Sequence, residues 1–192
     1  MSTRGSPITN GSVAATSTGF EPDRQLRICS GMRVSNAPKN SGGFVSNFTP
    51  LIAANGVVLL KAPVKGACLS SGFGPRGSRQ HKGIDYHQRP GGPVFAAGDG
   101  VIVEQQNRRD YGRMLLIDHG SGVYTRYAHL NHFGPGVRVG ARVSMGSALG
   151  IMGSTGRTNA VHLHYEILTG NYNNPNGSYG LKPHNPFANQ PN

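Results

Sequence analysis

The stretch HLHYEI, residues 162–167, alternates polar and apolar side chains without exception. In a β-strand, successive side chains point to opposite faces of the sheet. The apolar residues therefore fit a hydrophobic core on one face. His162, His164 and Glu166 share the other face. Two histidines on an exposed strand face can equally be solvated, so the rest of the chain has to decide whether they form a site.

The composition favours a β protein. The chain has 192 residues with 29 Gly, 13 Pro and no Trp, which suits one domain with an extension. Short apolar or alternating segments recur between glycines from residue 56 onward. We therefore expect a mainly β fold, with a compact antiparallel sheet as the core of a domain at residues 56–170. The expected strands lie in GVVLLKAP, PVFAAGDGVIVEQQ, RMLLIDHG, GVYTRYAHL, VRVG, ALGIMG and VHLHYEIL.

The two ends of the chain have a different texture. Residues 1–55 are rich in Ser, Gly, Asn and Thr, which predicts a poorly ordered tail followed by an extended arm. Residues 171–192 are rich in Asn, Pro and Gly, which predicts an irregular tail against the surface. The start has no apolar signal segment, and no run approaches the roughly 20 apolar residues of a membrane span.

Charge and cysteine content bear on partners and compartment. The 19 basic and 8 acidic residues give a net charge of +11, which implies attraction to a nucleic acid, an anionic lipid or an acidic wall polymer. The basic residues are scattered and no aromatic RNA-binding signature accompanies them, so we expect no nucleic-acid partner. Cys29 and Cys68 either form a disulfide, which implies an extracytoplasmic protein, or remain two buried thiols.

A second cluster of candidate ligands lies upstream, in HKGIDYH. His81 and Asp85 are separated by three residues that include Gly83, so a bend can bring both side chains to one point. Imidazole nitrogen and carboxylate oxygen both bind Zn²⁺, and three protein ligands with an open fourth position are usual in catalytic sites. With the HxH of the first stretch, this becomes a candidate three-ligand site. In TRYAHL, His129 is expected to share a strand face with Tyr127.

Taken in order, these segments resemble the M23 zinc metallopeptidases, the lysostaphin-like or LytM-type peptidoglycan endopeptidases, over about residues 66–168. The resemblance rests on SSGFGPR, HKGID, GDGVIV, IDHGSGVYTRYAHL, MGSTGRT and HLHYEI. It implies an antiparallel sheet with long loops around a groove. It also implies one Zn²⁺ held by His81, Asp85 and His164, with His162 and His129 beside the attacking water and the scissile carbonyl.

The implied activity is zinc-dependent hydrolysis of peptide cross-links or stem peptides of bacterial peptidoglycan. A zinc ion lowers the pKa of bound water toward about 7 and polarises the peptide carbonyl. We expect His162 to be the general base and His129 to donate a hydrogen bond to the developing oxyanion. Glu166 is expected to support a ligand, and His119 to have a structural role. His87 and His132 are expected on the surface.

Two departures from the family pattern bear on substrate. The segment 159–161 replaces a connection that commonly contains Gly and Pro, and GPRGSRQ lacks the Tyr of staphylolytic members. The resemblance therefore favours a stem-peptide cross-link, such as one between D-Ala and a diamino acid, over a glycine bridge. It implies a periplasmic or secreted protein.

Three alternatives remain open at this point. A non-catalytic relative would bind peptidoglycan or activate an amidase, and a phage particle or a secretion apparatus could carry the same peptidase domain. The arm before residue 56 could block the groove or supply a further metal ligand, for which Asn36, Asn40 and Asn47 are the candidates.

Overall fold

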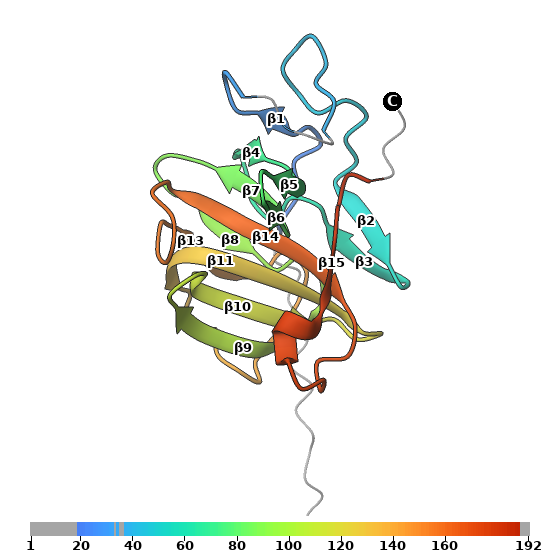
Figure 1. Cartoon of the computed structure of the whole chain (residues 1–192), viewed down its shortest axis with the longest axis vertical. Helices are drawn as coiled ribbons and strands as arrows, with labels where there is room; N and C mark the ends of the chain where they lie inside the picture. Colours follow the sequence, from blue (N-terminus) through green and yellow to red (C-terminus); the bar gives the residue numbers. More distant parts are fainter. Residues whose placement is uncertain (1–18, 33, 35–36, 189–192) are drawn as a thin grey trace, which may run out of the picture.

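The computed structural model describes residues 19–32, 34 and 37–188. Almost all of its regular structure is β (Figure 1). The strands up to the middle of the chain are β1 (Arg27–Ile28), β2 (Leu51–Ala54), β3 (Val57–Leu60), β4 (Cys68–Ser71), β5 (Gly74–Arg76), β6 (Arg79–His81), β7 (Ile84–His87), β8 (Pro93–Phe95) and β9 (Gly100–Arg108). They are followed by β10 (Gly112–Asp118), β11 (Val123–Phe133), β12 (Arg142–Val143), β13 (Ala148–Met152), β14 (His162–Thr169), the 3₁₀ helix η1 (Gly177–Gly180) and β15 (Lys182–His184).

One large sheet organises the molecule. Its strands lie in the order β1-β4-β7-β14-β11-β10-β9-β12, while β13 pairs with β11 and β8, and β15 pairs with β14. Every one of these pairings is antiparallel except β1 with β4. Two separate hairpins, β2–β3 and β5–β6, flank the sheet. The predicted mainly β, antiparallel architecture is confirmed, and Figure 1 shows β14, β11, β10 and β9 as its centre.

The strand β14 divides the sheet into a core face and a site face. Leu163, Tyr165 and Ile167 are at most 1% exposed and lie in the main hydrophobic core, as the alternation predicted. The opposite face carries His162 and His164. A smaller apolar cluster covers another part of that opposite face; it consists of Met114, Leu116, Tyr124, Ala128, Leu168 and Leu181. The histidines therefore occupy the uncovered part of a face that is otherwise packed.

A bulge in β11 changes the direction of His129. Tyr127 pairs with Leu115 and Leu130 pairs with Arg113, so two residues of β11 oppose one residue of β10. His129 has φ of 62°, and this left-handed residue reverses the alternation of the strand. Tyr127 and Leu130 are both in the core, whereas His129 lies with His162 on the site face. The expectation that Tyr127 and His129 share a face is therefore wrong.

Two expectations for other segments also need correction. VRVG is not a strand: residues 137–140 form a turn region, where Gly140 has φ of 84°, and the short strand there is β12. The C-terminal segment is not wholly irregular, because β15 pairs with β14. Leu181 and Phe187 anchor this segment by packing into the two apolar clusters. Hydrophobic residues spaced among Asn, Pro and Gly thus suffice to dock it.

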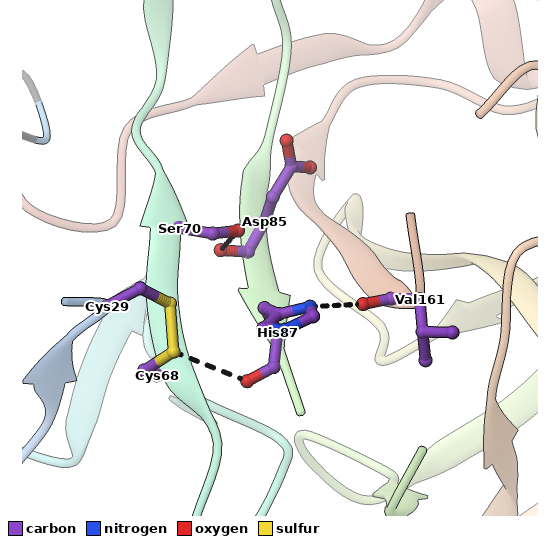
Figure 2. The surroundings of a disulfide bond; sticks show 6 residues. All are labelled: Cys29, Cys68, Ser70, Asp85, His87 and Val161. Atoms are coloured by element: carbon purple, nitrogen blue, oxygen red, sulfur yellow. Dashed lines mark hydrogen bonds between the residues drawn. A yellow bond between two sulfur atoms is a disulfide. The ribbon is translucent and has the colours of Figure 1, made fainter. Parts of the chain in front are cut away.

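The N-terminal arm is attached to the sheet. The strand β1 pairs with β4, and a disulfide joins Cys29 to Cys68 (Figure 2), so the disulfide alternative is confirmed. The hairpin β2–β3 spans the expected domain boundary at residue 56. The expected tail at residues 1–18 lies outside the described residues. The described part of the chain contains no helix with the length and apolar character that a membrane span requires.

Candidate active site

Three neighbouring strand segments bring the predicted ligands together. His81 ends β6, and Asp85 of β7 pairs directly with His164 of β14. The Nε2 atom of His81 lies 3.0 Å from Nδ1 of His164 and 3.1 Å from Oδ1 of Asp85, and Asp85 Oδ1 lies 2.9 Å from His164 Nδ1. A side chain at Gly83 would overlap the Tyr165 carbonyl, at 2.4 Å, so only glycine allows this approach.

This cluster fits a zinc ion in spacing and in chemistry. Donors around a tetrahedral ion with bonds of about 2.0 Å lie roughly 3.3 Å apart, close to the spacing found here. The second nitrogen of each imidazole is occupied elsewhere: His81 Nδ1 donates to the Gly72 carbonyl at 2.6 Å, and His164 Nε2 donates to Glu166 Oε1 at 2.9 Å. With these nitrogens occupied, His81 Nε2 and His164 Nδ1 are the atoms that each ring offers to a metal ion at the common point, once the ion displaces any proton on them.

Glu166 is the centre of a buried polar network. It is fully buried, pairs with Arg126 at 2.5 Å and accepts a hydrogen bond from the Tyr111 hydroxyl at 2.8 Å. Burial opposes its ionisation, but His164 and Arg126 outweigh this effect and lower the pKa of Glu166. The predicted supporting role of Glu166 agrees with this contact. Tyr111 and Arg126 carry no signal in the sequence, because each is defined by a partner far away in the chain.

The electrostatics of the cluster favour a cation. Burial raises the pKa of Asp85, but hydrogen bonds with His164 and His81 outweigh it and hold this pKa well below its usual value. Burial lowers the pKa of His164, but its hydrogen bonds to Asp85 and Glu166 prevail and raise the pKa to about 9. Two carboxylates thus stabilise positive charge between them, whether a proton or a metal ion supplies it.

A further arginine contacts the ligands from the β5–β6 hairpin. Arg76 Nη2 donates to Asp85 Oδ2 at 2.7 Å and also contacts Ser71 Oγ. This contact leaves Oδ1 of Asp85 facing the two imidazoles. Arg76 was not predicted from the sequence, although it lies five residues before His81.

His129 and His162 lie side by side next to the ligand cluster. Their ring centroids are 4.7 Å apart, and His162 Nε2 lies 3.8 Å from Asp85 Oδ1. Each ring is fixed by a backbone carbonyl: His162 Nδ1 donates to Ala160 at 2.9 Å and His129 Nδ1 to Thr155 at 2.8 Å. With Nδ1 protonated, a neutral ring can only accept a proton at Nε2.

Burial keeps these two imidazoles neutral. It lowers the pKa of His162, and it lowers that of His129 to about 4. At pH 7 both rings are therefore proton acceptors. Neutral His129 cannot donate a hydrogen bond from Nε2 unless it first gains a proton, which bears on the role that the resemblance suggested for it.

An open groove of about 590 Å³ runs over the cluster. Both expected catalytic histidines and all three expected ligands line it, together with Tyr111 and segment 157–160. His87 lines it too and its Nδ1 contacts the Val161 carbonyl at 2.6 Å, as Figure 2 shows, so His87 is a half-buried residue of the groove rather than a fully exposed one. The cause is its pairing with His162 across β7 and β14.

Other residues considered from the sequence lie away from the groove. His119 contacts the Asp99 carbonyl and Thr125, which is the structural role expected of it. His132 is exposed, as expected. Tyr127 is buried and accepts a hydrogen bond from the Ala97 amide, so it packs in the core.

The arm reaches the groove at one point. Among the described residues of the arm, Met32 lines the groove, and the described His/Cys/Asp/Glu groups that could hold a metal are the three predicted ligands. Asn40 accepts a hydrogen bond from the Phe44 amide in a turn, and Asn36 lies outside the described residues. That the arm restrains activity stays a prediction.

Comparison with known proteins agrees with this geometry. The sequence profile described as peptidase family M23 matches residues 79–176. The peptidoglycan DD-endopeptidase ShyA of Vibrio cholerae is 38% identical over 107 residues, which are 52% of this chain and 24% of that protein. A zinc-containing peptidase from Vibrio cholerae has a TM-score of 0.58 and 27% identity, over 74% of this chain and 47% of that one.

The catalytic domain of lysostaphin from Staphylococcus simulans is also similar, with a TM-score of 0.54 and 28% identity over 62% of this chain and 89% of that domain. In contrast, this chain covers between 20% and 28% of the length of the first curated relatives it matches. The likeness therefore concerns a peptidase domain that those relatives carry within longer proteins.

Proposed function

The chain belongs to peptidase family M23, and on this premise we propose that it is a zinc-dependent endopeptidase that hydrolyses peptide cross-links or stem peptides of bacterial peptidoglycan. One observation carries the proposal. His81, Asp85 and His164 meet with their donor atoms 2.9–3.1 Å apart, and two neutral imidazoles stand beside them in a groove. A ligand set with adjacent proton acceptors is what hydrolysis of a peptide bond requires.

Each part of the site has a task in this reaction. Zinc, when bound, supplies a Lewis acid that lowers the pKa of water and polarises the scissile carbonyl. His162 takes a proton from the attacking water at Nε2 and returns it to the leaving amine, since its Nδ1 is held by the Ala160 carbonyl. Glu166 and the Gly72 carbonyl fix the orientations of the two ligand rings.

His129 has a second, distinct task. In the neutral form it accepts a hydrogen bond at Nε2, which orients the attacking water, because its Nδ1 donates to Thr155. It donates to the oxyanion of the tetrahedral intermediate only while it carries a proton. The pH dependence of the rate distinguishes the two histidines. Loss of His162 lowers the rate at every pH near neutrality, whereas loss of His129 changes the rate most at acidic pH.

The proposed function includes a favoured peptide bond and a compartment outside the cytoplasm. A stem-peptide cross-link, with D-Ala on one side and a diamino acid on the other, is the favoured bond. The Cys29–Cys68 disulfide supports work in an oxidising compartment, either the periplasm or the exterior. The net charge of +11 would hold such a protein on an acidic wall.

Hydrolysis of purified peptidoglycan tests the proposal. Three preparations of the protein are incubated with wall material: the protein as purified, the protein after removal of metal with a chelator, and the chelated protein after addition of one equivalent of Zn²⁺. Products are identified by mass. We expect release of cross-linked or stem peptides that stops on chelation and returns with zinc. Zinc binding with an intact wall would instead favour a binding or amidase-activating member of the family.

A further inference from the structure

A second hollow of about 630 Å³ opens beside the groove. We call it the arginine hollow, because Arg108, Arg109 and Arg157 line it around one carboxylate, Asp110. Asp110 and Arg157 also line the groove, so the two spaces adjoin at these residues. Three guanidinium groups and one carboxylate leave an excess of positive charge at this end of the groove.

Part of the arginine hollow is held rigidly. The guanidinium carbon of Arg108 lies 4.3 Å from the ring centroid of Tyr179, and its Nε lies 3.4 Å from Asp110 Oδ1. The Tyr179 hydroxyl donates to Asp110 Oδ2 at 3.2 Å. The Arg157 amide donates to the Asp110 carbonyl at 2.9 Å, which ties the two loops together. The site is therefore shaped before a ligand arrives.

The other two arginines are available. Within the described part of the chain, the side chains of Arg109 and Arg157 make no hydrogen bond or ion pair. Guanidinium groups bind carboxylates through two parallel hydrogen bonds, in a geometry that ammonium groups do not match. The arginine hollow thus offers two unpaired groups suited to carboxylate ligands.

The far end of the groove is different. Ser70 and Ser71 of β4 and His87 of β7 line it there, and the sheet order separates β4 and β7 from β9 and β10. Besides Arg157, the Lys or Arg side chain that lines the groove is that of Arg76, which is engaged with Asp85. The groove is therefore electrostatically asymmetric, and an acidic peptide in it has a preferred direction.

We propose that the arginine hollow is an anion subsite that binds free carboxylates of the substrate peptide on one side of the scissile bond. The inference rests on the proposed function and deepens it, since peptidoglycan stem peptides contain acidic residues with free carboxylates. The ligand in this proposal is a peptide carboxylate rather than a phosphate of a separate wall polymer, because Arg157 lines both spaces and a peptide in the groove therefore lies beside the arginine hollow.

Paired substrates test the subsite. A cross-linked stem-peptide dimer is prepared with its carboxylates free and with the same carboxylates amidated, and kcat/KM and the dissociation constant are measured for each. For the wild type we expect at least about a tenfold preference for the free form, in both measurements, since charged hydrogen bonds to carboxylate are lost on amidation. In Arg109→Gln/Arg157→Gln the ratio of the two kcat/KM values and the ratio of the two dissociation constants both fall toward one, because the two unpaired guanidinium groups are lost.

A matched control removes two charges elsewhere. Arg138 and Arg142 lie near the opposite end of β9, so Arg138→Gln/Arg142→Gln keeps the wild-type preference if the subsite is local. Two results would overturn the subsite and leave the proposed function intact. The control variant could lose the preference for the free-carboxylate dimer as much as Arg109→Gln/Arg157→Gln does, or the wild type could bind and cleave the two dimers equally well. Binding preference without cleavage of either dimer sustains the subsite and overturns the proposed function.

Discussion

A single carboxylate connects the candidate metal site to the interior of the sheet. Glu166 accepts hydrogen bonds from His164 and Tyr111 and forms an ion pair with Arg126. All these contacts lie in a poorly hydrated environment, where an unpaired charge is costly. Orientation of the ligand ring and neutralisation of the buried arginine therefore depend on the same side chain.

We predict that Glu166→Gln weakens both metal binding and the fold. Arg126 would be left as a buried charge without its partner, which costs about 3–5 kcal/mol of unfolding free energy. Loss of the carboxylate behind His164 should weaken Zn²⁺ affinity by about 10–100-fold. Denaturant unfolding and chelator competition measure the two effects. Glu104→Gln, a buried carboxylate outside the ligand cluster, should leave zinc affinity unchanged; an equal loss there would contradict the account.

The neutral state of His129 predicts a pH dependence of stability. Its pKa is about 4 in the folded chain and 6.5 when unfolded, so the unfolded chain binds more protons below pH 6.5. Stability is therefore complete above pH 6.5 and falls as the pH drops toward 4, by at most about 2 kcal/mol between pH 6.5 and 5 from this residue.

Comparison of His129→Gln with the wild type isolates the contribution of His129 to the pH dependence of the unfolding free energy. Both proteins are kept metal-free, and their unfolding free energies are measured at pH 7 and pH 5. The variant should lose less stability than the wild type over this interval. The exposed His132→Gln should behave as the wild type does. Identical slopes for His129→Gln and the wild type would show that the imidazole is not held neutral.

At the scale of elements, the bulge in β11 and the loop after β13 set the position of His129. The loop carbonyl of Thr155 holds His129 Nδ1, and Thr155 Oγ1 bridges β10 and β11 by accepting from the Arg113 amide and donating to the Leu130 carbonyl. Gly112 packs against Thr155. The position of His129 thus depends on two connections between strands as well as on the strands themselves.

Alternation and motif spacing were enough to predict much of this arrangement. HLHYEI alone assigned the core face and the site face of β14, and His81 with Asp85 pointed to the group of candidate metal ligands. Alternation failed at His129, because a positive φ at a bulge leaves no mark in a sequence of ordinary residues. The groove position of His87 follows from its pairing with His162, across two strands that are distant in the chain. Tyr111, Arg126 and Arg76 have partners that only the fold brings near.

Gly112→Ala tests the connection between β10 and the loop. Gly112 has φ of 60°, and an added Cβ would lie 2.3 Å from the Thr155 carbonyl carbon. We expect displacement of Thr155 and hence of His129, with kcat lowered by about 10–100-fold and zinc content unchanged. Gly140→Ala is the matched control, because Gly140 also has positive φ but open space around it. If both variants lose activity equally, backbone strain alone explains the effect.

On the scale of the whole molecule, the N-terminal arm is a structural part of the domain. Leu26 and Ile28 lie in the main core, and the disulfide fixes the arm to β4, which neighbours the ligand-bearing β7 (Figure 2). Ser70 of β4 donates to the Asp85 carbonyl at 3.0 Å. Docking of the arm therefore supports the strand that carries the candidate metal ligand Asp85.

We predict that Cys29→Ser/Cys68→Ser lowers the unfolding free energy by about 4 kcal/mol, because the bridge closes a loop across 39 residues of separation. Urea unfolding measures the loss. The wild type treated with a reducing agent should lose a similar amount, which excludes an effect of the serines themselves. A stability equal to that of the oxidised wild type would mean that the arm is held without the disulfide.

The central claim is that His81 holds a metal ion and His162 moves a proton. The most direct measurement determines zinc content and peptidoglycan hydrolysis together for the wild type, His81→Ala and His162→Ala. The account predicts about one zinc and activity in the wild type, loss of both in His81→Ala, and retained zinc with lost activity in His162→Ala. Full activity of His162→Ala, or zinc retained by His81→Ala with wild-type affinity, would contradict it.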